Sequence, residues 1–126
     1  MPKLNPSVRA QLGERLKSRL PSHWRVNIGG KGHPFVELDQ DGRRPDHQFP
    51  ALGSTVIMIA HSMGDAIDAD VYKRVKQPPG YAEARSHQVT LASVSGRGWA
   101  KAIEDAVVEY AIEVEASLTT SEAAEA

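Results

Sequence analysis

The C-terminal part of the chain, from Trp99 to Leu118, has the pattern of a long amphipathic helix, and this feature constrains the fold more than any other. Its apolar residues recur every three or four positions, the spacing that places them on one face of an α-helix. They are Trp99, Ile103, Ala106, Val107, Tyr110, Val114 and Leu118. Ser95 or Gly96 lies where a helix cap is expected. Such a helix is stable only when its apolar face covers another element of the fold.

The end of this segment has a second interpretation. Tyr110, Ile112 and Val114 alternate with glutamate and alanine, so residues 109–115 also fit a half-buried strand. The tail, residues 119–126, contains no large apolar residue, which predicts a disordered acidic and alanine-rich segment. We therefore expect one domain over residues 1–118, since a chain of 126 residues is long enough to bury one core but too short for two.

The N-terminal segment predicts a second amphipathic helix, from Asn5 to about Leu20. Asparagine is a good N-cap, and the missing N–H of Pro6 costs nothing at the first helical position. Apolar residues then follow every fourth position, which makes a single stripe. They are Val8, Leu12, Leu16 and Leu20. Pro21 ends the helix.

The pattern changes to a period of two after this helix. Residues 24–28 alternate apolar and polar side chains, as a half-buried strand requires, and residues 34–38 fit the return strand of a hairpin. Residues 39–54 are rich in aspartate, arginine, proline and glycine and have no periodicity, which predicts a long surface loop.

The middle of the chain contains its most apolar run, residues 55–60, which predicts a strand covered on both faces. Ser62 and Asp65 have the spacing of a capping box, so we expect a short helix to follow. The apolar stripe of that helix is Met63, Ile67, Val71 and Val75. Residues 87–94 predict a further strand. Its two faces are Val89 and Leu91 on one side and Thr90, Ala92 and Val94 on the other.

Together these elements predict an α+β fold. It has an N-terminal helix, a mainly antiparallel sheet of about four strands, and helices packed on one face, including the long C-terminal helix. The formal net charge is -1, which gives no general attraction for nucleic acid or for anionic membranes. The absence of cysteine excludes disulfides and thiolate chemistry, and no segment is long and apolar enough to span a membrane. We therefore expect a soluble protein that is not exported.

Residues 56–64 resemble the nucleophile elbow of α/β-hydrolases and lipases, a G-x-S-x-G turn between a strand and a helix. Alanine stands at the first position, as in some lipases, and Ser62 would be the nucleophile. Only His87 follows the serine as a general base, and about 60 residues are too few for the remaining parallel strands and helices of that fold. The alternative, purely structural interpretation is a buried strand that leads into a helix capped by serine.

Two other patterns fall short of a site. Asp39, Asp41, Asp46 and His47 offer oxygen and nitrogen ligands, but the segment lacks the length and the closing glutamate of a calcium loop. The five histidines have no spacing typical of a metal site, and the glycine-rich turn at residues 29–32 is not followed by the serine or threonine of a phosphate loop. We expect no metal and no cofactor.

The order of elements around residues 24–44 resembles the small toxins of the HicA type, which have a double-stranded-RNA-binding-like fold. In those toxins a histidine after the glycine turn is catalytic, and the resemblance places this role on His33. Residues 45–53 and the elements after Pro79 have no place in that pattern, and the near-neutral charge argues against strong phosphate binding.

A different resemblance covers about a third of the chain. Residues 8–26, an amphipathic helix that ends in Leu-Pro before a strand with a tryptophan, are similar to the opening of the tail terminator and tail-completion proteins of long-tailed bacteriophages. Residues 87–106 are similar to the strand, small turn and alanine-rich acidic helix of that family. The family usually has another strand after the long helix, which only residues 110–115 can supply here.

The resemblance implies a virion component and not an enzyme. Such proteins form a ring, commonly of six subunits, that caps the tail tube at the head–tail junction and contacts neck proteins. They are assembled in the host cytoplasm, and DNA passes through the ring. Loops and turns then make the subunit contacts, and arginine and aromatic side chains are enriched at such contacts. The candidate interface residues are Arg43, Arg44, Phe49, Arg97 and Trp99.

Overall fold

Five antiparallel strands and two helices make up the fold of the computed structural model, which describes residues 4–21, 24–29, 35–40, 55–62, 65–75 and 84–125. In chain order the elements are α1 (Pro6–Arg19), β1 (Trp24–Ile28), β2 (Phe35–Gln40), β3 (Thr55–His61), β4 (Ile67–Val75), β5 (Ala84–Val94) and α2 (Trp99–Glu125). The strands follow one another across the sheet in the order β1-β2-β3-β4-β5. The predicted α+β class is confirmed, with five strands in place of about four.

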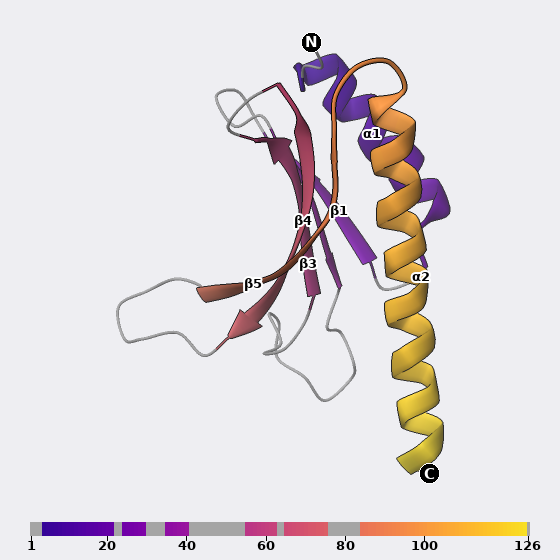
Figure 1. Cartoon of the computed structure of the whole chain (residues 1–126). Helices are drawn as coiled ribbons and strands as arrows, with labels where there is room; N and C mark the ends of the chain where they lie inside the picture. Colours follow the sequence, from indigo (N-terminus) through magenta and orange to yellow (C-terminus); the bar gives the residue numbers. More distant parts are fainter. Residues whose placement is uncertain are drawn as a thin grey trace.

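Both helices lie on the same face of the sheet, as predicted, and the core lies between them and the strands (Figure 1). Alternate residues of the strands point to this face. Val26, Leu38, Ile57, Val71 and Val89 are aligned across all five strands. The helices complete the core with Leu12, Leu16, Ile103 and Val107. Burial of these aliphatic side chains is the main source of stability, at about 1.5–3 kcal/mol for each one fully buried.

Helix α1 begins and ends as the sequence predicts. The Asn5 side chain accepts a hydrogen bond of 2.9 Å from the Val8 N–H, and the chain becomes extended at Leu20 before Pro21. The segment before the helix is tied to the sheet, because the Leu4 N–H donates to His61 Nε2 at 3.2 Å. Arg9 is buried and donates to the Leu4 carbonyl, which fixes the same segment from the other side.

Strand β4 replaces the helix predicted from Ser62, and that prediction was wrong. Ile67, Val71 and Val75 are four residues apart, and a spacing of four is an even number, so the same residues also share one face of a strand. Ala69 adds the missing apolar position of a period of two, and it is buried beside Ile67 and Val71. Ile67, Val71 and Val75 are also β-branched, which favours a strand.

The strand before it, β3, is buried at its start on both faces. Val56 and Ile57 point to opposite faces and neither is exposed, whereas Met58 and Ala60 are half-buried. The predicted hairpin is present as the antiparallel pair of β1 and β2, although β2 continues to Gln40. Asp39 and Gln40 therefore belong to a strand and not to the predicted loop. The rest of that loop, residues 41–54, lies outside the described residues.

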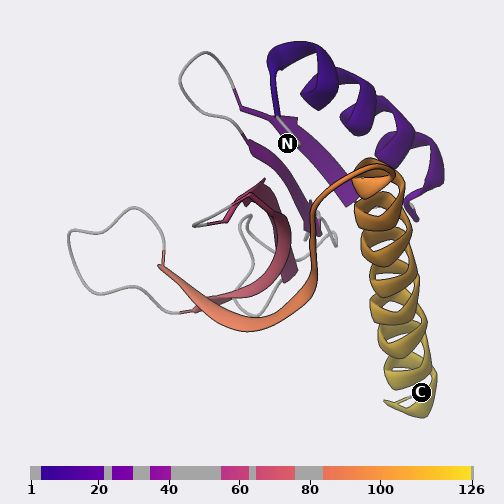
Figure 2. The same ribbon diagram turned by 45° about the horizontal axis from the view of Figure 1, so that its top comes forward.

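Strand β5 contains two irregularities that the sequence analysis did not predict. Its register against β4 shifts at Leu91 and again at Gln88, where β5 has one residue more than β4. A β-bulge bends its strand and increases the local twist, and Figure 2 shows β4 and β5 curling into an arc. The bulges also change the alternation, so Leu91, Ala92 and Val94 all pack against the core. The predicted assignment of Leu91 to the opposite face from Ala92 and Val94 was wrong.

Helix α2 is continuous through residues 109–115, so the alternative strand is excluded there. The helix continues to Glu125, into the tail that we expected to be disordered. Its buried residues are Ile103, Glu104, Val107, Val108 and Ala111. Glu115 still accepts a hydrogen bond of 3.0 Å from Trp24 Nε1 on β1, and the last part of the helix runs past the end of the sheet towards the C-terminus (Figure 1).

Candidate functional site

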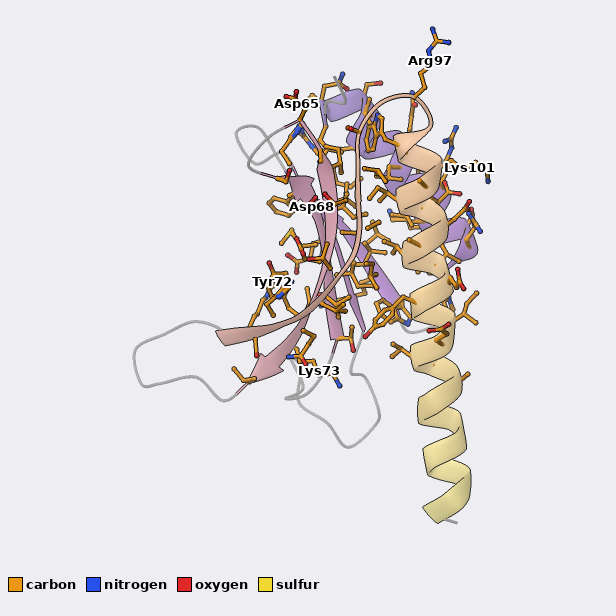
Figure 3. All side chains as sticks on the ribbon, in the orientation of Figure 1. Asp65, Asp68, Tyr72, Lys73, Arg97 and Lys101 are labelled. Carbon is orange, nitrogen blue, oxygen red and sulfur yellow. The ribbon has the colours of Figure 1, made fainter. Side chains whose placement is uncertain are left out.

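The face of the sheet that the helices leave uncovered is lined by charged and polar side chains. We call it the open face. Strand pairing aligns two rows of residues across it, one position away from the rows that face the core. The first row is Arg25, Asp39, Val56, Tyr72 and His87, and the second is Asn27, Glu37, Met58, Asp70 and Thr90. Figure 3 shows Tyr72 on the side of the sheet away from α2.

The most buried charge on this face is Asp39, which is only 2% exposed. Arg25, directly opposite on β1, donates to it twice, from Nε to Oδ1 at 2.8 Å and from Nη2 to Oδ2 at 3.0 Å. A planar guanidinium matches a carboxylate in this two-pronged geometry. A buried carboxylate is costly unless it is paired and hydrogen-bonded, and the two bonds from Arg25 offset part of the cost of burying Asp39.

A second ion pair shows that the open face is concave. Arg85 on β5 donates to Glu37 on β2, from Nη2 to Oε1 at 2.9 Å and from Nη1 to Oε2 at 3.4 Å. Strands β3 and β4 lie between them, and in a flat sheet the two backbones are about 14 Å apart. The contact is made because the bulges bend β5 across the face. Both side chains are mostly buried, with 25% of Arg85 and 14% of Glu37 exposed.

The third cluster lies near the edge of the open face, on β4 and β5. Asp70 Oδ1 is 3.1 Å from His87 Nε2, and the Thr90 hydroxyl donates to the same oxygen. The Tyr72 and His87 rings meet edge to face with their centres 5.2 Å apart. Each group at this edge therefore already has a partner within the sheet.

Asp68 differs from these residues, because its Oδ1 is buried and has no hydrogen-bond partner. Its strand neighbours on the open face are Ala60 and Ser93. Within the part of the chain that the structure describes, no group of three or more histidine, aspartate or glutamate side chains is arranged to bind a metal ion. The open face therefore has the chemistry of a paired, polar contact surface.

Ser62 does not lie in a nucleophile elbow. It follows β3 in the connection to β4, and its hydroxyl donates to the Ala66 carbonyl at 3.2 Å. No helix follows it, so the predicted turn from strand to helix was wrong. His87 is paired with Tyr72, five residues along β4 from Ile67, which is about 17 Å at the rise of a strand. The serine lies before the start of β4 and the histidine lies beside its second half, so the two side chains are far apart.

The predicted interface residues are placed very differently. Arg43, Arg44 and Phe49 lie outside the described residues, as does His33. Arg97 is exposed at the turn before α2, between Gly96 and Gly98, which both have positive φ. Trp99 is half-buried and packs against the core, so it is a less accessible contact residue than Arg97. Asp41, Asp46 and His47, whose sequence pattern falls short of a metal site, also fall outside the described residues.

A separate ion-pair cluster joins the two helices. Arg19, at the end of α1, donates from Nη1 to Glu104 and, at 2.8 Å, to Asp105. The hydrogen bond that Arg19 donates to Asp105 is the largest cause of the raised pKa of Arg19, and the same bond lowers the pKa of Asp105. Lys101 adds a weaker contact to Asp105 at 3.5 Å. The cluster holds α1 against the first half of α2.

Sequence reasoning missed the residues that line the open face. A signal was present, because Arg25 and Asn27, Glu37 and Asp39, and Asp68 and Asp70 are the polar positions of alternating strands. Their partners were not visible in the sequence, since the ion pairs join different strands. Arg85 was outside the strand predicted at 87–94.

The sequence matches no protein-family model, and no curated protein and no solved structure matches the chain. Neither of the two described helices has the combination of length and apolar character needed to cross a membrane.

Proposed function

We propose that this protein is a structural assembly component of a phage virion, a tail terminator or tail-completion protein that forms a ring at the head–tail junction. The observation that carries the proposal is the order of elements in the two stretches that resemble that family. Residues 8–26 form a helix that ends before a tryptophan-containing strand, and residues 87–106 form a strand, a turn and a helix.

The local geometry of the second stretch supports this assignment. β5 ends at Val94, the turn uses glycines with positive φ at residues 96 and 98, and α2 begins at Trp99. Only glycine adopts such backbone angles without steric cost, so the two glycines specify the conformation of this turn. One departure from the family stands, because α2 is followed by no strand in the part of the chain that the structure describes.

The surfaces of the molecule support a role in assembly more than one in catalysis. The Ser62 hydroxyl and His87 each bond to other groups and lie far apart along β4, so His87 is not positioned as the general base of the serine. The Arg97 turn and the distal half of α2 project from the body of the protein (Figures 1 and 3). Such projections supply contacts in a ring without any reacting group.

The test is the oligomeric state of the purified chain, measured by light scattering and analytical ultracentrifugation. It is measured alone and with a tail-tube protein from the same genome. We expect one defined oligomer, visible as rings in negative-stain electron micrographs, either alone or when the tube protein is added. A chain that stays monomeric under both conditions and binds no tail or neck component contradicts the proposal.

The toxin alternative makes a different prediction, which the same preparation tests. An RNA-cleaving toxin degrades RNA, and His33→Ala abolishes that cleavage. Two additional strands, β4 and β5, stand between the three-strand unit of that pattern and its last helix, so we favour the assembly role.

A further inference from the structure

Charge is distributed very unevenly along this chain. Residues 1–108 contain all 15 lysines and arginines and 11 of the 16 acidic residues, which is a net charge of +4. Residues 109–126 contain five glutamates and no lysine or arginine, which is a net charge of -5. The nearly neutral total therefore conceals a basic body and an acidic distal half of α2.

Two glutamates in the acidic half of α2 have no charged partner among the described residues of their own molecule, whereas Glu115 accepts a hydrogen bond of 3.0 Å from Trp24 Nε1. Glu104 and Asp105, in the first half, bond to Arg19, and Lys101 also contacts Asp105. The side chains of Glu109 and Glu113 are exposed and make no hydrogen bond or ion pair within the part of the chain that the structure describes. Carboxylates are also disfavoured towards the C-terminal end of a helix, where the helix dipole is negative, and no basic residue lies in the last turn of α2.

The same half of the helix has fewer contacts with the sheet, although Trp24 on β1 donates a hydrogen bond to Glu115. Ile112 is 51% exposed, and Ala116 is exposed as well. A helix of 27 residues is about 40 Å long, and Ala111 is the last fully buried side chain that the structure describes on it, with Val114 and Glu115 half-buried. A helix that carries exposed apolar and uncompensated acidic residues at one end is expected to contact a basic surface.

Two exposed basic residues lie at the other end of α2, and one of them, Lys101, already contacts Asp105 at 3.5 Å. Arg97 is exposed, has no ion-pair partner among the residues that the structure describes and points away from the molecule, and Lys101 lies on the outer side of the helix one turn further on (Figure 3). From Arg97 to Glu113 the distance along the helix is more than about 20 Å. This exceeds the Debye length of about 8 Å at physiological ionic strength, so the two ends attract each other only weakly within one molecule. They attract strongly only when two copies bring them into contact.

We propose that the acidic distal half of α2 of one copy docks against the Arg97–Lys101 end of α2 of the next copy. This contact is head-to-tail, because it joins two different surfaces, and such contacts close into a ring when the rotation between copies allows it. The inference rests on the proposed ring assembly and identifies its subunit contact. Charge complementarity sets the partner and the register of the contact, and Ile112 adds apolar area to it.

Two charge-reversal variants test this contact. One carries Arg97→Glu and Lys101→Glu, and the other carries Glu109→Lys and Glu113→Lys. Each alone places like charges together, so we expect the dissociation constant for self-association to rise by about tenfold or more. An equimolar mixture of the two variants restores opposite charges at every contact, so we expect it to assemble again, with the two variants alternating.

The matched control is the pair Lys73→Glu and Asp65→Lys, which reverses exposed charges on and beside β4 (Figure 3). This variant is expected to assemble as the wild type does. Circular dichroism and thermal unfolding of each variant show whether it is folded before its assembly is compared.

The outcomes separate the two proposals. If the wild type forms its oligomer and both reversed variants do so equally well, or if mixing them restores nothing, the α2 contact is wrong while the assembly role stands. If the wild type remains monomeric with and without the tail-tube protein, both proposals are wrong.

Discussion

The two faces of the sheet are stabilised by different interactions, although they belong to the same five strands. The helix-covered face consists of aliphatic side chains that are almost completely buried, such as Ile57, Ile59 and Val71. The open face is lined by arginine, carboxylate and histidine side chains that pair across strands, such as Arg25 with Asp39. The first face supplies most of the stability through non-directional burial. The second face favours one arrangement of the strands, because its ion pairs form only when the strands have the correct register and curvature.

The largest difference between the faces is expected from truncating the core. Ile57→Ala removes a side chain that is not exposed and leaves a cavity among Leu38, Val71 and the helices. We expect the free energy of unfolding to fall by about 2–5 kcal/mol, measured by urea denaturation at a fixed protein concentration. Met58→Ala, on the next residue and the opposite face, is the control and should cost clearly less. Equal losses contradict the division of roles between the faces.

A smaller effect is expected from removing the buried carboxylate of the open face. Asp39→Ala leaves the Arg25 guanidinium without its partner, and we expect a loss of about 1–3 kcal/mol. The double variant with Arg25→Ala completes a double-mutant cycle. Because Arg25 is one-third exposed, the double variant should be little less stable than Asp39→Ala alone. Fully additive losses would mean that the two side chains do not interact.

The ion pair between β2 and β5 should contribute less to the free energy of unfolding than the buried pair of Arg25 and Asp39. Arg85→Met keeps the length of the side chain and removes its charge, and we expect a loss of about 0.5–1.5 kcal/mol. Amide hydrogen exchange should increase in the first half of β5, where the pair holds the bent strand over the open face. Glu37→Gln should give the same exchange pattern. Unchanged exchange in β5 for both variants would show that the bulges alone maintain the curvature.

The smallest effect is expected at the exposed ion pair between the helices, which belongs to neither face. The hydrogen bond from Arg19 lowers the pKa of Asp105 below its ordinary value of 3.8. A lowered pKa in the folded state stabilises the fold at every pH above that ordinary value, and the stabilisation is lost as the pH falls through the lowered value. Thermal unfolding followed between pH 6 and about pH 2 should therefore decline less steeply in Asp105→Asn than in the wild type. If the stability of the two proteins falls equally steeply with pH, the lowered pKa of Asp105 is contradicted.

The sequence predicted the elements whose signal is local. Asn5 and Pro6 start α1 by satisfying or omitting backbone donors, and this chemistry needs no tertiary contact. The apolar run in β3 and the helical face that begins at Trp99 were likewise visible from composition and spacing. The α+β class followed from the change of period along the chain.

The sequence failed where one pattern fits two structures. Ile67, Val71 and Val75 satisfy both a helix and a strand, and only pairing with β3 and β5 selects the strand. The bulges at Leu91 and Gln88 cannot be predicted from the alternation of apolar and polar residues. Each bulge is a single extra residue that interrupts this alternation. Without them, the contact of Arg85 with Glu37, 48 residues away, is not predictable.

What the sequence by itself determined about this protein is the position and type of most elements and the division of charge between a basic body and an acidic end. These properties depend on residues that are near one another in the chain. What only the tertiary structure decided is the identity of β4, the curvature of the sheet and the partners of each charged group on the open face. Those outcomes depend on contacts between distant strands, whose energies become favourable only after the backbone has brought the strands together.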